Sequence, residues 1–484
     1  MKKKDIHILK GYKTRMASRV ISKCRPMLAI AFVLTLILAA CSDYKEDYQL
    51  CQVRVTLIYP DTLQGCPYTG APITLKDSKG VIFTEKSDTT GSALFNVPPG
   101  TYEAGSSDTH TTDIYKYVFN ALKSGIVIQP EENNSILLSV NITKKEVIKP
   151  EEPEEDDKPG DKNFESIIIK ELYTGGCRKD DGTSTFQHDK GVVIYNNSNK
   201  KAVVTNLCFA TGNTNAYASN AAKNYNDEGV FVPDTYDTPF QPAWSMIWYL
   251  PEELTIQPYS QVVISINGAI DNTLTVSNSV NYANAEYYCM YDPDAGWTGE
   301  MSTSFYPTPA DVIPASHYLK GKMYGVGSAW ALQAASPAFF IFKLKDSTPL
   351  DFANDNSNDW YLPGYDNDII ELCKKVPQTD VIDAVEVFSA KYSTASQYKR
   401  LSANLDAGYV MLTNYQGHTV YRNVDKEATM KIEGNEEKLV YGYADDPSGI
   451  DAEASIKNGA KIVYLDTNNS TNDFHEREAF SIKQ

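Results

Sequence analysis

Oxygen-rich side chains between residues 351 and 368 come nearest, by type and spacing, to a site of chemistry. Asp351, Asp355 and Asp359 recur at every fourth position, and carboxylate oxygens are ligands that Ca²⁺ prefers. The spacing departs from the calcium-binding EF-hand loop, because Trp360 stands where that loop needs its turn glycine. A solvated Asn/Asp turn is the alternative. We predict no resident cofactor and keep calcium, on these three carboxylates, as the one candidate.

Aromatic side chains gather in two stretches, residues 213–249 and 268–335. Tyr and Trp rings favour interfaces and can stack on a sugar or anchor a partner protein. The alternative is that they pack these stretches onto the rest of the domain. The candidate ligand-binding aromatics are Trp244, Trp248, Trp297 and Trp330.

Motifs of known catalytic machinery are missing from the sequence. It has no GxSxG nucleophile motif, no phosphate-binding P-loop, no GxGxxG opening a helix and no HExxH metal motif. The histidines after residue 40 occur singly, at positions 110, 188, 317, 418 and 475. The sequence therefore predicts that the protein is not an enzyme and has no catalytic residue.

Cys41 has the context of a lipidated cysteine. It follows Leu38-Ala39-Ala40 at the end of an apolar run from residue 27, which is too short to span a bilayer. Basic residues precede that run, as in a signal peptide. Residues 1–40 are therefore predicted to be a lipoprotein signal peptide, starting at Met1 or Met16, and residues 41–50 a tether. Lys45-Glu46-Asp47 resembles the signal that exports Bacteroidota lipoproteins to the cell surface.

Charge and cysteine usage suit an exported protein. The chain of 484 residues has a formal charge of −17, with 32 Tyr and 17 Phe, and removing the basic leader makes it more acidic still. An acidic field repels nucleic acid, so we predict no nucleic-acid partner. Cys51 and Cys66 flank one expected hairpin and are a candidate disulfide. Other pairings remain open for the cysteines at 177, 208, 289 and 373.

The first domain is expected over residues 51–145. Residues 53–57 alternate apolar and polar side chains as a strand does. Further on, a turn ending in Gly91, the alternating Ala93 and Phe95, Pro99-Gly100 and Tyr102 resemble the signature of the carboxypeptidase-regulatory, transthyretin-like β-sandwich. That resemblance implies a spacer or docking module with no chemistry of its own. Residues 146–163 are acidic and proline-rich, and we expect an extended linker there.

The second domain is expected over residues 164–484. Its ordered segments resemble a lamin-tail domain, an immunoglobulin-like β-sandwich. The segments that carry the resemblance are Gly175-Gly176, Tyr195-Asn196-Asn197-Ser198, Ile256-Gln257-Pro258, Ile382-Asp383-Ala384-Val385 and the closing run from Asp466 to Phe474. Asp466-Thr467-Asn468-Asn469 is expected to be a structural turn. Residues 213–243 and 268–335 are long additions to that pattern.

Together these features predict an all-β protein, a transthyretin-like sandwich followed by a larger lamin-tail-like sandwich with long insertions. The arrangement resembles a group of uncharacterised Bacteroidota surface lipoproteins. We expect a lipid-anchored protein of the outer membrane, at the cell surface, that acts by binding. Its expected partners are the membrane and either an outer-membrane receptor, such as a TonB-dependent nutrient receptor, or a carbohydrate ligand. The alternatives are an adhesin or envelope structural protein and, less favoured, an undetected enzyme.

Overall fold

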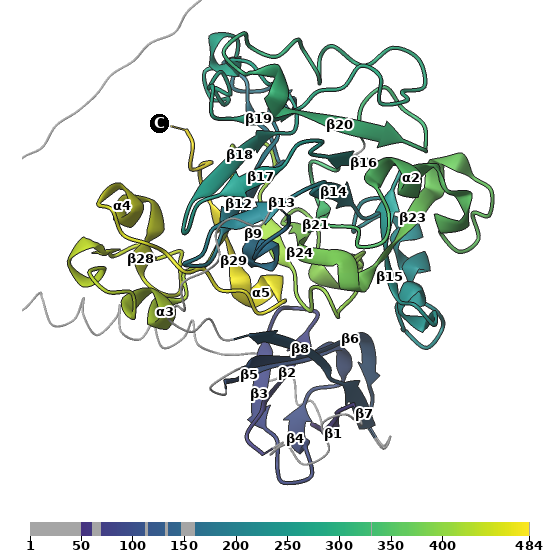
Figure 1. Ribbon diagram of the computed structural model, residues 1–484. Helices are drawn as coiled ribbons and strands as arrows, with labels where there is room; N and C mark the ends of the chain where they lie inside the picture. Colours follow the sequence, from purple (N-terminus) through teal and green to yellow (C-terminus); the bar gives the residue numbers. More distant parts are fainter. Residues whose placement is uncertain are drawn as a thin grey trace, which may run out of the picture. The chain divides into compact units, whose positions relative to one another are not determined.

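The computed structural model describes residues 50–60, 69–111, 115–130, 134–146, 160–330 and 332–483. Strands dominate these ranges and the helices are few and short (Figure 1). The prediction of an all-β fold is therefore confirmed. Cys41, the leader, Cys66 and most of the linker lie outside the described residues, so the expectations placed on them stay predictions.

Two sheets form the first β-rich region. One has the strand order β4-β1-β7 and the other β3-β2-β5-β6-β8. A single apolar cluster between them includes Val53, Ile73 and Phe95. The strands are β1 (Cys51–Ile58), β2 (Pro72–Asp77), β3 (Ile82–Lys86), β4 (Ser92–Val97), β5 (Gly100–Thr111), β6 (Tyr115–Ile128), β7 (Asn134–Ser139) and β8 (Asn141–Glu146).

Alternation along the strands explains this packing. Val53, Val55 and Leu57 of β1 are buried while the intervening side chains are partly or fully exposed, because successive side chains in a strand point to opposite faces. Gly91 has φ 75° in the turn before β4, a conformation that side chains oppose. The Tyr102 hydroxyl donates to the Pro98 carbonyl at 2.8 Å, which holds the β4–β5 connection.

One sheet of 12 strands organises the rest of the described chain. Its order is β25-β24-β21-β14-β16-β20-β19-β18-β12-β9-β26-β29. The bounds are β9 (Ile167–Tyr173), β12 (Gly191–Asn196), β14 (Cys208–Thr211), β16 (Met246–Tyr249), β18 (Gln261–Ser265), β19 (Tyr288–Met290), β20 (Tyr318–Met323), β21 (Ala338–Phe342), β24 (Val381–Ser389), β25 (Val410–Leu412), β26 (Thr419–Arg422) and β29 (Phe474–Arg477).

The sheet folds back so that its two end strands, β25 and β29, lie against each other. Its strands enclose one apolar core that includes Ile169, Trp248 and Phe339. The 268–335 stretch was expected as a long addition to the basic sandwich. It instead supplies β19 and β20, which lie inside the sheet between β18 and β16.

Smaller elements cover this sheet. Two-stranded ribbons are β10 (Cys177–Arg178) with β11 (Thr185–Phe186), β13 (Ala202–Val204) with β17 (Leu254–Ile256) and β27 (Val440–Tyr441) with β28 (Ile450–Asp451). A further sheet has the order β15 (Phe240–Trp244), β23 (Leu372–Pro377), β22 (Asp359–Tyr361). The α-helices are α2 (Pro349–Asn354), α3 (Lys426–Met430), α4 (Ala452–Lys457) and α5 (Ser470–Asp473).

Short helical segments complete the described chain. They are the 3-10 helices η2 (Phe164–Ser166), η3 (Ser219–Asn224), η4 (Val232–Thr235), η5 (Asn272–Leu274), η6 (Ala315–His317), η7 (Asn356–Asn358), η8 (Ile369–Glu371), η9 (Gln378–Asp380), η10 (Thr394–Ser396) and η11 (Glu436–Lys438). Among the described residues, none of the helices has the length and apolar character that a membrane span requires.

A bulge in β9 places two charged side chains together on one face. Glu171 pairs with Val193 and Ile169 with Ile194, so Lys170 is the extra residue. Both charged side chains are fully buried. Lys170 Nζ lies 2.6 Å from Glu453 Oε1, and the Ser481 amide donates to Glu171 Oε1 at 3.0 Å. Burial raises the pKa of Glu171 to about 7.

Replacing Trp248 tests whether one core supports the 12-stranded sheet. Trp248→Ala should lower the free energy of unfolding by roughly 3–5 kcal/mol, because the indole is fully buried and its loss leaves a cavity. Denaturant unfolding measures the change. Trp297 packs on the same core but is only partly buried, so Trp297→Ala should cost clearly less. Equal losses for the two variants would contradict this description of the core.

Candidate functional site

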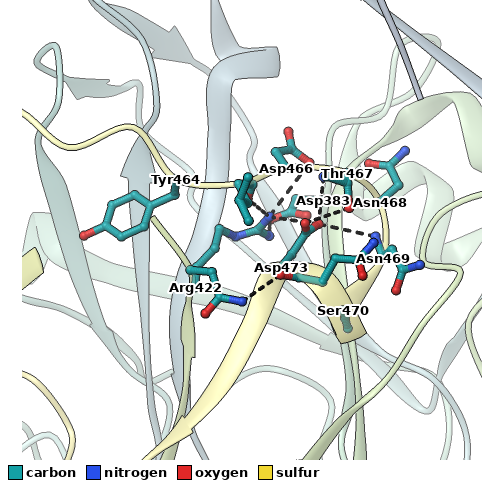
Figure 2. A network of polar contacts seen from close by, with 12 residues as sticks. Asp383, Arg422, Tyr464, Asp466, Thr467, Asn468, Asn469, Ser470 and Asp473 are labelled. Atoms are coloured by element: carbon teal, nitrogen blue, oxygen red, sulfur yellow. Dashed lines mark hydrogen bonds and ion pairs between the residues drawn. The ribbon is translucent and has the colours of Figure 1, made fainter. Parts of the chain in front are cut away.

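A buried arginine lies at the centre of a network of polar contacts (Figure 2). Arg422, at the end of β26, is 1% exposed. Its Nε donates to the Ile169 carbonyl at 2.7 Å and its Nη1 to the Leu465 carbonyl at 2.9 Å. Its Nη2 donates to the carboxylate of Asp383, which lies on β24. The guanidinium carbon lies 4.4 Å from the centre of the Phe474 ring. One side chain thus connects β9, β24, β26 and the chain before β29.

Three carboxylates keep this arginine charged. Asp383 forms an ion pair with it, and the nearest oxygens of Asp466 and Asp473 are each 3.8 Å from Nη1. Burial acts to lower the pKa of Arg422, but the three carboxylates raise it overall, Asp383 most strongly. The guanidinium therefore remains a fixed cation inside the protein.

The Asp473 carboxyl group has a perturbed pKa. Burial raises its pKa to about 6 although Arg422 acts in the opposite direction. The Thr467 amide donates to Asp473 Oδ2 at 2.8 Å and the Thr467 hydroxyl to Oδ1 at 2.7 Å. Asp473 thereby closes residues 466–473 into a loop, which we call the Asp466–Asp473 loop.

Further hydrogen bonds fix the middle of the Asp466–Asp473 loop. Asn469 caps α5 by accepting from the Thr471 amide at 3.1 Å. The Ser470 amide and hydroxyl donate to the two carboxylate oxygens of Asp406 at 2.7 and 2.6 Å. Asn468 has φ 53°, a conformation that asparagine tolerates better than most residues. Within the loop, the Asn469 and Asp473 side chains accept hydrogen bonds from backbone amides, an arrangement typical of a structural turn.

The other side of this loop offers neutral hydrogen-bonding groups. The Thr467 carbonyl accepts from Asn120 Nδ2 at 2.7 Å. Asn468 Nδ2 donates to the Thr143 hydroxyl at 2.8 Å, and Asn472 Nδ2 donates to the Ser107 hydroxyl at 2.9 Å. Charge is therefore enclosed on the inner side, and amide and carbonyl groups meet strands β5, β6 and β8. This arrangement is suited to holding protein surfaces together.

The structure buries three of the four candidate ligand-binding tryptophans. Trp248 and Trp330 belong to the main core, and Trp244 packs with Phe240 and Trp360. The prediction that these three are available to a ligand is wrong, because their rings are buried in these apolar clusters. Trp297 is partly buried and its indole N–H donates to the Asp292 carbonyl at 2.9 Å. For Trp297 the prediction remains untested.

The three candidate calcium ligands have separate structural roles. Asp351 lies in the first turn of α2 and accepts from the Thr348 hydroxyl at 2.7 Å. Asp355 caps η7, and Asp359 pairs with Lys374. Within the described residues, no group of three or more His, Cys, Asp or Glu side chains is arranged to hold a metal ion. The structure does not bring these three carboxylates together.

The described cysteines are all buried. Cys51 is buried on β1, but Cys66 lies outside the described residues, so their pairing stays a prediction. Cys177, Cys208, Cys289 and Cys373 are buried free thiols. Burial raises the pKa of Cys177 to about 11 and that of Cys289 to about 12. These thiols are therefore protonated and unreactive at neutral pH.

Sequence reasoning missed the central residue of the network. It identified the run from Asp466 and the strand holding Asp383, but not Arg422, which lies 39 residues beyond Asp383. One signal was available, since a charged residue inside an apolar strand is almost never buried without a partner. Both Asp383 and Arg422 fit that description, in Val-Ile-Asp-Ala-Val and Val-Tyr-Arg.

The fold and the Arg422 network define the class of this protein. It is an all-β protein in which buried ion pairs hold the Asp466–Asp473 loop against the 12-stranded sheet. Residues 257–481, which include that loop, match a family described as "Protein of unknown function (DUF4876)". The chain is also similar to the crystal structure of a DUF4876 family protein from Bacteroides thetaiotaomicron. The identity is 18% and the TM-score 0.47, over 88% of this chain and 94% of that one. A search of curated proteins found no match.

Gly408 provides a direct test of how closely the loop is packed. A Cβ at this position would lie 2.0 Å from Asn469 Oδ1 and 2.6 Å from the Thr471 amide nitrogen. Gly408→Ala should therefore lower the free energy of unfolding by roughly 1–3 kcal/mol through overpacking. In Gly175→Ala, the matched control, the nearest atom to the new Cβ is at an ordinary 3.5 Å. A Gly408→Ala protein as stable as the control would contradict the packing.

Asp473 should make the stability of the protein depend on pH. Its pKa is 3.8 in an ordinary setting and about 6 when folded, so folding favours its protonated form. This contribution is fully present below pH 3.8 and is lost as the pH rises to about 6. Asp473→Asn cannot titrate. The free energy of unfolding of the variant minus that of wild type should therefore rise, by about 1–3 kcal/mol, between pH 4 and pH 6.5. A constant difference across that range would contradict the assignment.

Proposed function

We propose that this protein is a lipid-anchored protein of the outer membrane, exposed at the cell surface, that acts by binding another molecule. The observation that carries the proposal is Leu38-Ala39-Ala40-Cys41 after a basic segment and a short apolar run. Several acyl chains on Cys41 would hold the protein on a membrane almost permanently. The acidic residues after Cys41, with Lys45-Glu46-Asp47, support export to the outer face.

The use of charge inside the large sheet supports a binding role. Arg422, Arg400 and Lys170 are fully buried, and each lies against at least one carboxylate. Buried ion pairs of this kind fix the arrangement of strands. A fixed scaffold loses little conformational entropy when it binds, which favours affinity.

The proposed location in the outer membrane suggests a nutrient receptor as the partner. An outer-membrane lipoprotein shares its membrane with TonB-dependent transporters, and an accessory that delivers ligand would need an anchor there. Affinity purification of the lipidated full-length chain under mild detergent should recover a TonB-dependent transporter. Recovery with the unlipidated chain as well would place the contact on the folded domains, and recovery from neither would contradict the accessory role.

Replacing the anchoring cysteine tests the location. In a Gram-negative host, wild-type protein should incorporate labelled palmitate, enter the membrane fraction and be digested by protease added to intact cells. Cys41→Ala should lose the label and the membrane association, because acylation needs the thiol. Cys24→Ala, which removes a cysteine inside the leader, should behave as wild type. An unmodified Cys41 in the mature wild-type protein, seen by mass spectrometry, would contradict the proposal.

A further inference from the structure

Two stretches that the network above does not use meet at one hollow in the large domain. The end of β20 comes from the 268–335 addition, and α2, η7 and β22 come from the oxygen-rich 351–368 run. Together with β23 they line a hollow of about 300 Å³. That volume is at the lower end of the range for small-molecule sites, enough for a single sugar ring with water.

One face of the β22–β23 pair lines this hollow. In the β22–β23 pair, Asp359 lies opposite Lys374 and Tyr361 opposite Leu372, and all four line the hollow. The intervening Trp360 belongs instead to an apolar cluster with Phe240. Successive side chains alternate between the two faces of a strand. The register of β22 with β23 therefore places Trp360 in the apolar cluster and its neighbours Asp359 and Tyr361 in the hollow.

The floor of the hollow is a fixed ion pair. Lys374 is 1% exposed, and its Nζ lies 2.5 Å from Asp359 Oδ1. The same ammonium donates to the Asp355 carbonyl at 2.9 Å and lies 5.5 Å from the centre of the Tyr324 ring. These three contacts hold Lys374 in place, so the polar floor is organised before any ligand arrives.

The rim carries hydrogen-bonding groups that the described chain leaves unused. Four polar side chains line the hollow and make no hydrogen bond to another described residue, namely those of Lys322, Asn354, Asn356 and Tyr361. Amide groups donate and accept at once, as sugar hydroxyls do. Ile369 is 46% exposed beside them and offers an apolar surface.

We propose that this hollow binds a pyranose unit of a carbohydrate. The two asparagine amides pair with vicinal hydroxyls, while Tyr361 and Ile369 contact the C–H face of the ring. Lys322 lies where it can meet a carboxylate, so an acidic sugar and a neutral one share this chemistry and are told apart by experiment. The inference rests on the proposed binding function and names its ligand class.

Calorimetric titration of the purified full-length chain tests the inference. The probes are maltohexaose, cellohexaose, mannohexaose and oligogalacturonate. At least one should bind, and Tyr361→Ala should weaken that binding at least tenfold. Tyr398→Ala removes an exposed tyrosine away from the hollow and should leave affinity unchanged. Lys322→Ala should weaken oligogalacturonate alone if the acidic sugar is the ligand, and should have little effect on a neutral one.

Two results would overturn the inference. One is that no probe binds the wild-type chain, and the other is that the affinity of a bound probe is the same in wild type and in Tyr361→Ala. Far-ultraviolet circular dichroism of each variant confirms that it is folded. Neither result affects lipidation of Cys41, so failure of the carbohydrate site and failure of the proposed location are separate outcomes.

Discussion

Arg422 is the residue on which the described structure of the large domain most depends. A guanidinium taken out of water costs several kcal/mol unless carboxylates and carbonyls replace the lost hydration. Here Asp383 from β24, carbonyls at Ile169 and Leu465, and the more distant Asp473 supply that replacement. Removing Asp383 would leave the buried guanidinium without its ion pair. The same contacts determine where the Asp466–Asp473 loop lies.

The same solution recurs elsewhere in the sheet. Arg400 and Glu386 are both fully buried, and the guanidinium also donates to the carbonyls of Thr214 and Ser336 at 2.8 and 2.7 Å. Lys170 lies between Glu453 and the rings of three tyrosines. Segments pack on both faces of this sheet, so outward-pointing charges become internal. The large domain therefore combines an apolar core with satisfied ion pairs.

The sequence pattern predicted those features of the fold that depend on residues close together in the chain. The alternation at Val53, Val55 and Leu57 was enough to predict a strand with one buried face. The turn residue Gly91 was enough to predict a turn before the strand that holds Ala93 and Phe95. The all-β class followed from these signals. In β9 every side chain is buried, because segments cover both faces, and no alternation was there to read.

Features that depend on contacts between residues far apart in the chain could not be predicted from the sequence. Residues 288–290 form a strand of only three residues that is parallel to both neighbours, so periodicity over so short a run carries no signal. Arg422 meets Asp383 and Asp473 only after the sheet has formed. The four tryptophans have large side chains that suit either a core or a binding surface. Their spacing in the sequence does not distinguish a buried ring from an exposed one.

A double-mutant cycle between Arg422 and Asp383 measures the central interaction most directly. The free energies of unfolding of wild type, Arg422→Met, Asp383→Asn and the double variant would be compared at pH 7. If the buried pair fixes the sheet, the stability losses of the two single variants should together exceed the loss of the double variant. The difference, which is the coupling energy, should be roughly 1–3 kcal/mol. Losses that add to within about 0.5 kcal/mol would contradict the account.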